Sequence, residues 1–437
     1  MRAVRARRRD AARPLRRLAL LVASFVLSAM TVVPWVMPGS QALPPSTADS
    51  GTAVWRHNGA AAPRYREWDG SAFAPVQSSA GTGEWRIMQG AAAPTRSEVV
   101  AAGVRSDGNI TGEIWNGGSW AALPFNPLAT VTETYWWSVD VAYEVVSGDA
   151  LLVWANGSAG TTPLSFRAWD GSSWTAAAPI TVPLPGRTRQ LLLVAAPDSD
   201  EMVLVASNEF SQDYAVVWDG SAWGNALTLD ASGNNDDRTD IAAAYLQQSG
   251  TALVAYGRNS ANPHFRNWDG SGWSGEFTIN APAGISGKAR WLALASDPGS
   301  DALALGVLTF ANEVWLGVWD GSAWIDLLEA TGAAAGQIFP GVDVAFEDAS
   351  GEALATYAEA NNRFRFRTWA AGSGWSARRD GADLGAHPNS MTLDARSDSN
   401  EIMLAVQDDA SDLHYTLWDG SAWGAQTEVD KIGRAHV

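Results

Sequence analysis

The chain has 437 residues, which is enough for one large repeat domain or for two or three ordinary domains. It contains no cysteine, so disulfide bonds and thiolate metal sites are excluded. The formal net charge is −17, and because residues 1–42 hold eight arginines and one aspartate, the remainder carries −24. A surface this acidic repels phosphate backbones, so we predict that the protein binds no nucleic acid.

The first 42 residues have the pattern of a secretory signal peptide. An arginine-rich segment precedes a long apolar run, and Ser40 and Ala42 are small residues at the −3 and −1 positions of a cleavage site. The apolar run is also long enough for an uncleaved membrane anchor, but Pro34 within it and the small residues favour cleavage. We therefore predict a secreted or cell-surface protein without membrane insertion after cleavage, with residues 43–50 as a linker.

Between residues 51 and 430, a hexapeptide of the form Trp-Asp-Gly-Ser-Ala-Trp or a near-copy returns about every 50 residues. The copies begin at Trp68, Trp115, Trp169, Trp218, Trp268, Trp319, Trp369 and Trp418. A period of this length indicates a propeller or a solenoid. Each repeat shows the pattern of four short antiparallel strands, whereas a solenoid coil needs only one or two. We predict an all-β fold, a β-propeller of eight four-stranded blades.

The centre of each hexapeptide is a tight-turn sequence, which predicts a hairpin. If the turn closes on Gly220-Ser221, Trp218 and Trp223 lie directly opposite each other on the two strands. If it closes one residue earlier, the two indoles lie on opposite faces of the sheet. Nearly every copy keeps tryptophan at both ends, so we expect opposed indoles that pack between blades and lock the hairpins.

A second period of about 100 residues divides the chain into four two-blade units. In odd repeats the turn after the first strand is Ser-Gly, and in even repeats it is longer and mostly acidic. We interpret the acidic turns as solvated surface turns, since none matches a calcium-binding loop. The third strand of odd repeats reads aromatic-Arg-x-Trp, which gives the pairs Arg66 and Trp68, Arg167 and Trp169, Arg266 and Trp268, and Arg367 and Trp369.

Each of these arginines shares a strand face with its tryptophan, because side chains two residues apart in a strand point the same way. One interpretation is structural: a buried guanidinium needs a partner, and Glu144 or Glu347 could supply a carboxylate from a neighbouring strand or blade. The other is functional: a guanidinium beside an indole forms the polar half of a ligand pocket. The four Arg/Trp pairs are therefore our candidate ligand-binding residues.

Signals for catalysis are poor. The chain has five histidines, and neither Gly-x-Ser-x-Gly nor His-Glu-x-x-His occurs. No repeat carries a large unique insertion, although an active site would break the symmetry of the repeats. We predict a binding protein with no catalytic residues, no metal and no cofactor. A glycoside hydrolase is a distant alternative, because its paired carboxylates need only be close in space.

The segment Trp-Asp-Gly-Ser-Gly-Trp-Ser-Gly at residues 268–275 resembles the tandem repeat of the bacterial seven-bladed, fucose-binding propeller lectins. The resemblance recurs at the hairpin of every blade and does not extend over the rest of the repeat. It implies a propeller that binds sugars in clefts between or within blades, through aromatic and polar side chains. We therefore expect lectin-like recognition of glycans, with a scaffold propeller that binds a surface protein as the alternative.

The two ends of the repeat array differ from its middle. The first repeat begins at its second strand, near Gly51, so we expect the first blade to lack its innermost strand. Residues 431–437 match no part of the repeat, and Ile432–Val437 equals the translation of a common sequencing adapter. We expect these residues to have no repeat-like structure, the natural chain to continue past Asp430, and a strand beyond it to complete the first blade.

Overall fold

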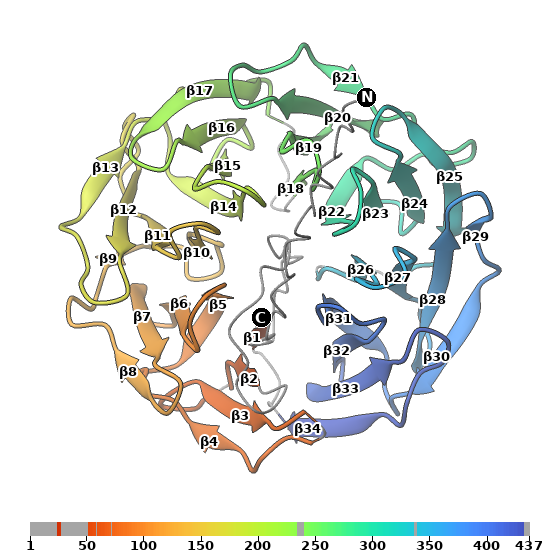
Figure 1. Cartoon of the computed structure of the whole chain (residues 1–437), viewed down its shortest axis with the longest axis horizontal. Coiled ribbons are helices and arrows are strands. Elements are labelled where there is room, and N and C mark those ends of the chain that lie inside the picture. Colours follow the sequence, from red (N-terminus) through yellow and green to blue (C-terminus); the bar gives the residue numbers. More distant parts are fainter. Residues whose placement is uncertain are drawn as a thin grey trace, which may run out of the picture.

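In the computed structural model the chain forms a ring of eight β-sheets around a centre, as predicted (Figure 1). The structure describes the backbone of residues 24–27 and, with side chains, residues 51–431 except 58, 71, 234–239 and 336–338. The described residues contain no helix that is long and apolar enough to cross a membrane. The terminal segment 432–437 lies outside the described residues, whereas Lys431 ends the last strand.

The first four blades follow one another along the chain, each with its strands in sequence order from the centre outward. Blade 1 has β1 (Ser24–Leu27), β2 (Gly51–Trp55), β3 (Arg64–Trp68) and β4 (Gln77–Ser78). Blade 2 has β5 (Trp85–Ala92), β6 (Val99–Arg105), β7 (Asn109–Trp115), β8 (Trp120–Ala122) and the additional β9 (Ala129–Thr130). Blade 3 has β10 (Val139–Tyr143), β11 (Ala150–Ala155), β12 (Leu164–Trp169) and β13 (Ala178–Ile180). Blade 4 has β14 (Thr188–Ala195), β15 (Met202–Asn208), β16 (Asp213–Trp218) and β17 (Trp223–Asp230).

The last four blades repeat this order and bring the chain back to blade 1. Blade 5 has β18 (Ile241–Tyr245), β19 (Ala252–Arg258), β20 (Ser260–Trp268) and β21 (Phe277–Thr278). Blade 6 has β22 (Ala289–Ser296), β23 (Leu303–Thr309), β24 (Val314–Trp319) and β25 (Trp324–Thr331). Blade 7 has β26 (Val342–Phe346), β27 (Ala353–Ala358), β28 (Arg363–Ala370), β29 (Gly374–Trp375) and the additional β30 (Arg379–Asp383). Blade 8 has β31 (Pro388–Ala395), β32 (Ile402–Asp408), β33 (Asp412–Trp418) and β34 (Thr427–Lys431).

The first blade differs from the others in its innermost strand. Residues 51–78 supply only β2, β3 and β4, so this part of the chain lacks the innermost strand, as predicted. The innermost position is taken by β1, from the segment with the signal-peptide pattern, which the sequence did not suggest. β1 pairs with β2 in parallel, whereas the innermost strands of blades 2 to 8 all pair antiparallel with the second strand.

The hairpins confirm the predicted opposed aromatic residues in every blade, although the loop of blade 7 is one residue longer than the others. Trp218 pairs directly with Trp223, and the first and last aromatic residues of the other seven hexapeptides pair in the same way. Asp219 closes the turn, since its N–H donates to Ala222 O at 3.1 Å and its carboxylate accepts from the N–H of Ser221 and of Ala222. The two residues at the tip are therefore Gly220 and Ser221.

In the even blades, the opposed indoles pack against an aromatic residue of the preceding odd blade. The ring of Phe166 in blade 3 lies 5.5 Å from Trp218 and 5.8 Å from Trp223 in blade 4. Tyr65, Phe265 and Phe366 make the same contacts with blades 2, 6 and 8. These rings close the seams that run from an odd blade to the next even blade, because large aromatic side chains bury much apolar surface.

The acidic turns of even blades join neighbouring blades and are not merely solvated. The Oδ1 atom of Asp200 in blade 4 accepts from the N–H of Val146 at 3.0 Å and of Ser147 at 2.8 Å, both in the Ser-Gly turn of blade 3. Asp301 in blade 6 accepts from the matching turn of blade 5 in the same way. The alternation of Ser-Gly and acidic turns is therefore a repeated hydrogen-bonding device between blades.

Replacing Gly220 by alanine is expected to lower the free energy of unfolding by about 1 kcal/mol or more. Gly220 has a φ of 89°, and a Cβ there would lie 3.2 Å from the Cβ of Asp200. Gly224→Ala is the matched control, since no atom lies within 4 Å of the added Cβ. Thermal unfolding of both variants checks the prediction, and equal melting temperatures would contradict it.

Candidate functional site

Three of the four candidate arginines donate to a backbone carbonyl just beyond the hairpin of their own blade: Arg167 to Thr175, Arg266 to Ser274 and Arg367 to Ser376. The distance from Arg266 Nη1 to the carbonyl oxygen is 2.8 Å. The fourth, Arg66, is partly buried on β3. These bonds fix each guanidinium beside the hairpin without a carboxylate partner, and each of the three arginines remains partly exposed.

Glu144 and Glu347, suggested above as partners for the arginines, instead bind tryptophans of the next blade. Each carboxylate accepts an indole N–H at 2.6 Å, Glu144 from Trp218 and Glu347 from Trp418. That expectation was wrong because these glutamates face the next, even blade. The Arg/Trp faces of the odd blades point the other way, toward the preceding even blade.

Polar contacts across three seams show this orientation. The indole N–H of Trp169 in blade 3 donates to Glu98 of blade 2 at 2.9 Å. Trp273 in blade 5 donates to the backbone oxygen of Asn225 in blade 4 at 2.8 Å. In blade 7, Trp369 donates to Asp326 of blade 6 at 2.7 Å. The seams from an even to an odd blade therefore combine indoles, guanidinium groups and polar atoms.

The richest of these arrangements is in blade 5, where seven side chains gather on the face toward blade 4. We call this set the blade 5 site: Tyr256, Arg258, His264, Arg266, Trp268, Trp273 and Glu276. The carboxylate of Glu276 links its members, since it accepts from the hydroxyl of Tyr256 at 2.6 Å and binds His264 Nδ1 at 3.1 Å. It also pairs with Arg258. The two indole rings lie with their centroids 5.4 Å apart.

The electrostatics of the blade 5 site keep its charges in place. Burial, and then the hydrogen bond to Glu276, raise the pKa of Tyr256 to about 12, so its hydroxyl stays protonated. Burial alone would raise the pKa of Glu276, but the hydrogen bond from Tyr256 and the charge of Arg258 outweigh it and lower that pKa. The site therefore offers a fixed carboxylate beside a guanidinium, both partly exposed.

Blade 7 carries a related site with the charges exchanged. We define the blade 7 site as Tyr357, Glu359, Arg365, Arg367, Trp369, Trp375 and Arg378. Here Glu359 is the link, since it pairs with Arg365 at 2.9 Å and with Arg378 at 2.8 Å. These two arginines lower the pKa of Glu359, although burial alone would raise it. The two sites thus share a tyrosine, an arginine and two indoles, and differ in the surrounding charges.

In blades 1 and 3, aromatic rings from the preceding blade cover the matching surface. Phe125 of blade 2 lies 4.1 Å from the guanidinium of Arg167 and packs against Trp174. Tyr415 of blade 8 packs edge-on against Trp68 and Phe73, with centroids 6.0 and 5.0 Å away. The four predicted Arg/Trp pairs therefore fall into two classes, and the sequence did not separate them.

Two polar residues that contact the blade 5 and blade 7 sites were not predicted from the sequence. Asn225 and Asp326 stand two residues after the hairpins of blades 4 and 6, and both have a φ of 50°. They lie where the pairing of the third and fourth strands shifts register. The sequence signal for them is Trp-Gly-Asn and Trp-Ile-Asp, which end two of the hexapeptides only. Asn and Asp indicate a left-handed residue at this position, because they tolerate that backbone better than most residues.

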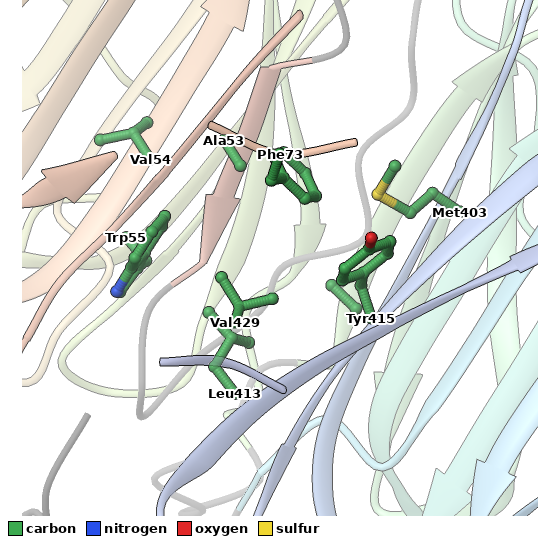
Figure 2. A pocket seen from close by; sticks show the side chains of 9 residues that line it. Ala53, Val54, Trp55, Phe73, Met403, Leu413, Tyr415 and Val429 are labelled. Carbon is green, nitrogen blue, oxygen red and sulfur yellow. The ribbon is translucent and has the colours of Figure 1, made fainter. Parts of the chain in front are cut away.

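A small cavity lies at the seam between blades 8 and 1, and its surroundings are apolar (Figure 2). Ala53 and Trp55 of β2 face Met403, Leu413 and Val429 of blade 8 across it. A sugar needs hydrogen-bonding groups, which this lining does not provide. We therefore assign the cavity to the packing of the ring and not to the candidate site.

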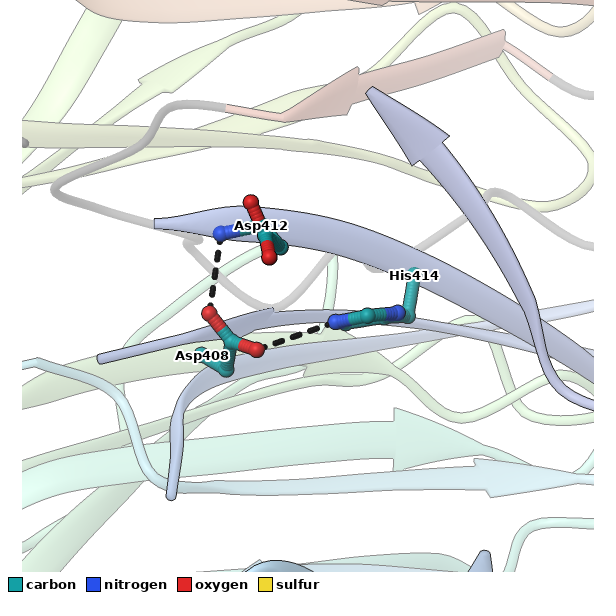
Figure 3. Close-up of side chains that lie close together, drawn as sticks. All are labelled: Asp408, Asp412 and His414. Carbon is teal, nitrogen blue, oxygen red and sulfur yellow. Dashed lines mark hydrogen bonds and ion pairs between the residues drawn. The ribbon is translucent and has the colours of Figure 1, made fainter. Parts of the chain in front are cut away.

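One group of acidic and histidine side chains in blade 8 has the spacing of metal ligands (Figure 3). Asp408 accepts from the N–H of Asp412 at 2.8 Å and lies 3.0 Å from Nε2 of His414. The amino group of Lys431 is 3.1 Å from Asp412. In blade 4, Asn208 accepts in the same way from the N–H of Gln212, four residues later. Asp408 therefore stabilises the turn of blade 8 that corresponds to this turn of blade 4. The group is a closed hydrogen-bonded network that shapes this turn.

Comparisons with known proteins give a fold but no family. No protein-family model matches the chain. No curated protein matches it either. Among solved structures, a lectin from Burkholderia pseudomallei, BP39L, superposes with a TM-score of 0.56 at 11% sequence identity, covering 79% of this chain and 100% of the lectin.

Fungal lectins give weaker superpositions. The fucose-recognising, six-bladed lectin of Aleuria aurantia has a TM-score of 0.43 at 14% identity, with 80% of this chain and 97% of the lectin covered. AofleA of Arthrobotrys oligospora has a TM-score of 0.44 at 11% identity, with 80% of this chain and 88% of that chain covered. These two superpositions are too weak to carry an argument, and at 11% identity the likeness to the Burkholderia lectin concerns the fold alone.

Proposed function

We propose that this protein is a lectin-like glycan-binding protein that acts at the cell surface or outside the cell, and that the blade 5 and blade 7 sites bind the sugars. The observation that carries the proposal is a combination that repeats on two seams: a partly exposed indole and guanidinium next to a buried tyrosine and a second, buried indole. The propeller likeness to a bacterial lectin supports it, and the signal-peptide pattern supports export.

The chemistry of a sugar ring fits this combination. Its C–H faces are apolar and pack on an indole, while its hydroxyl groups both donate and accept hydrogen bonds. Arg266, which binds the residue next to Trp273, offers a donor, and Glu276 of the same site offers an acceptor; all three side chains are partly exposed. Binding through a few such contacts is weak at one site, so two sites on one ring would act by avidity.

Replacing Arg266 and Arg367 by alanine together is expected to weaken binding to glycan-coated beads by about a hundredfold, and each single change by about tenfold. A glycan array probed with the full chain identifies the sugar for this measurement. The guanidinium groups of Arg266 and Arg367 bond only within their own blade, to a backbone carbonyl and to Tyr256 or Tyr357, so the variants should keep the melting temperature within a few degrees.

Arg167→Ala is the matched control, because Phe125 covers this arginine. It should leave glycan binding unchanged while removing the same number of atoms from the same strand position. An array without a single bound glycan would contradict the proposal. Equal glycan binding by the double variant, with its fold intact, would remove the two sites from it.

A further inference from the structure

The innermost strands form an inner ring that has one unusual member. β5, β10, β14, β18, β22, β26 and β31 follow one another around the centre, each next to the innermost strand of the adjacent blade. Between β31 of blade 8 and β5 of blade 2 stands β1, which runs parallel to β2. If the segment with the signal-peptide pattern is removed, the inner edge of β2 has no strand from residues 51–431 to pair with.

Contacts of blades 3 and 7 show what a strand at this position can offer, whereas the innermost strand of blade 5 has Ala242 as its second residue. In blades 3 and 7 the second residue of the innermost strand is an aspartate that accepts an N–H from the innermost strand of the next blade. Asp140 accepts from Leu193 at 2.8 Å, and Asp343 accepts from Leu393 at 2.7 Å. The same register position in blade 2 is Gly90 of β5. An aspartate on a strand in blade 1 would therefore face the N–H of Gly90.

The fifth residue of the innermost strand depends on the preceding blade. The hydroxyl of Tyr143 donates to Glu98 of blade 2, and that of Tyr245 donates to Glu201 of blade 4, both at 2.9 Å. In blade 7 this residue is Phe346, and the matching residue of blade 6, just before β23, is an alanine. Where the preceding blade offers a glutamate, the fifth residue of the innermost strand is therefore a tyrosine. Where the preceding blade has an alanine, that residue is a phenylalanine.

Blade 8 presents a glutamate at this position. Glu401 stands just before β32, as Glu98 stands just before β6 and Glu201 before β15. Its side chain is 41% exposed and pairs with Arg396, whereas the side chain of Glu98 is 10% exposed. The innermost position of blade 1 is therefore flanked by an acceptor for a tyrosine hydroxyl in blade 8 and by the Gly90 backbone in blade 2.

We propose that the innermost position of blade 1 is an acceptor site for an antiparallel strand with the pattern apolar-Asp-apolar-Ala-Tyr, the pattern of Val139–Tyr143. Such a strand would pair with β2 as β10 pairs with β11, with its tyrosine opposite Gly51 and its aspartate opposite Val54. A strand added to a sheet edge gains main-chain hydrogen bonds, and its side chains set the specificity. This inference is independent of glycan binding.

The test uses the full chain with a protease site placed within residues 43–50, before and after cleavage and removal of the N-terminal fragment. The probe is a labelled peptide with the sequence of residues 138–145. We expect saturable binding to the cleaved protein, at least tenfold weaker binding to the uncleaved protein, and a higher melting temperature of the cleaved protein with peptide. Two peptide variants, Tyr143→Phe and Asp140→Asn, should each bind about fivefold to tenfold more weakly.

Three results would overturn the proposal: no saturable binding to folded, cleaved protein; equal binding of a scrambled peptide; or a dimer of the cleaved protein that the peptide does not dissociate. If cleavage unfolds the protein, a second variant decides. It carries residues 138–145 after Val437 on a Gly/Ser linker, and it should remain folded after cleavage by circular dichroism. Unfolding of that variant would also overturn the proposal.

Discussion

Replacing Glu347 by alanine is expected to lower the free energy of unfolding by about 3 kcal/mol. The side chain of Glu347 is buried, and it accepts from Trp418 Nε1 and from the hydroxyl of Ser350, each at 2.6 Å. Alanine would leave both donors at the seam between blades 7 and 8 without an acceptor. A buried donor without an acceptor costs about 1–3 kcal/mol, and the carboxylate contacts are charge-assisted. Urea unfolding measures the loss.

Blade 5 supplies a natural comparison for this prediction. The residue that corresponds to Glu347 is Leu246, and the indole N–H of Trp319 across that seam has no acceptor among the described residues. Leu246→Ala, which removes packing but no hydrogen bond, is the control for lost volume. Glu347→Gln keeps an acceptor for Trp418 and should recover most of the loss. A glutamine variant as unstable as the alanine variant would contradict the hydrogen-bonding explanation.

The sequence predicted the ring but not the chemistry between its blades. The eight evenly spaced hexapeptides predicted the number of blades, and a two-residue turn at Gly220-Ser221 predicted the opposed indoles. Both predictions succeed because they depend only on residues that are close together in the sequence. The fate of Arg167 depends on Phe125, which is about 40 residues away in another blade. No local pattern distinguishes a ring that covers a guanidinium from one that packs elsewhere.

The two-blade period has a physical basis in the alternation of the seams. Seams from odd to even blades are closed by aromatic rings such as Phe166 and by acceptors such as Glu144. Seams from even to odd blades are more polar, and they contain the Arg/Trp pairs. One set of seams can therefore hold the ring together while the other varies in sequence. This explains how blades 5 and 7 exchange the positions of acidic and basic side chains around the same tyrosine, arginine and indoles.

Raising the pH from 5.5 to 8 is expected to lower the free energy of unfolding by about 2 kcal/mol for each of two buried aspartates. Burial raises the pKa of Asp140 and of Asp343 to about 7, and the hydrogen bonds from backbone N–H groups offset this only in part. In the unfolded chain an aspartate has a pKa of about 3.9. Between these values the folded state holds protons that the unfolded state has released. The stabilisation is therefore complete below about pH 4 and is lost as the pH rises through about 7.

The carboxylates of the hairpin turns do not change the pH dependence of stability between pH 5.5 and 8. Hydrogen bonds from Ser221 and Ala222 lower the pKa of Asp219, so it is ionised in both states above pH 5.5 and contributes no pH dependence there. The double variant Asp140→Asn, Asp343→Asn should therefore flatten the profile of unfolding free energy against pH by about 4 kcal/mol across this range. Asp219→Asn should leave the slope unchanged. Chemical denaturation at half-unit pH steps distinguishes the two. A wild-type stability that is flat or rises between pH 5.5 and 8, or a double variant with the wild-type slope, would show that these aspartates are ionised in the folded ring.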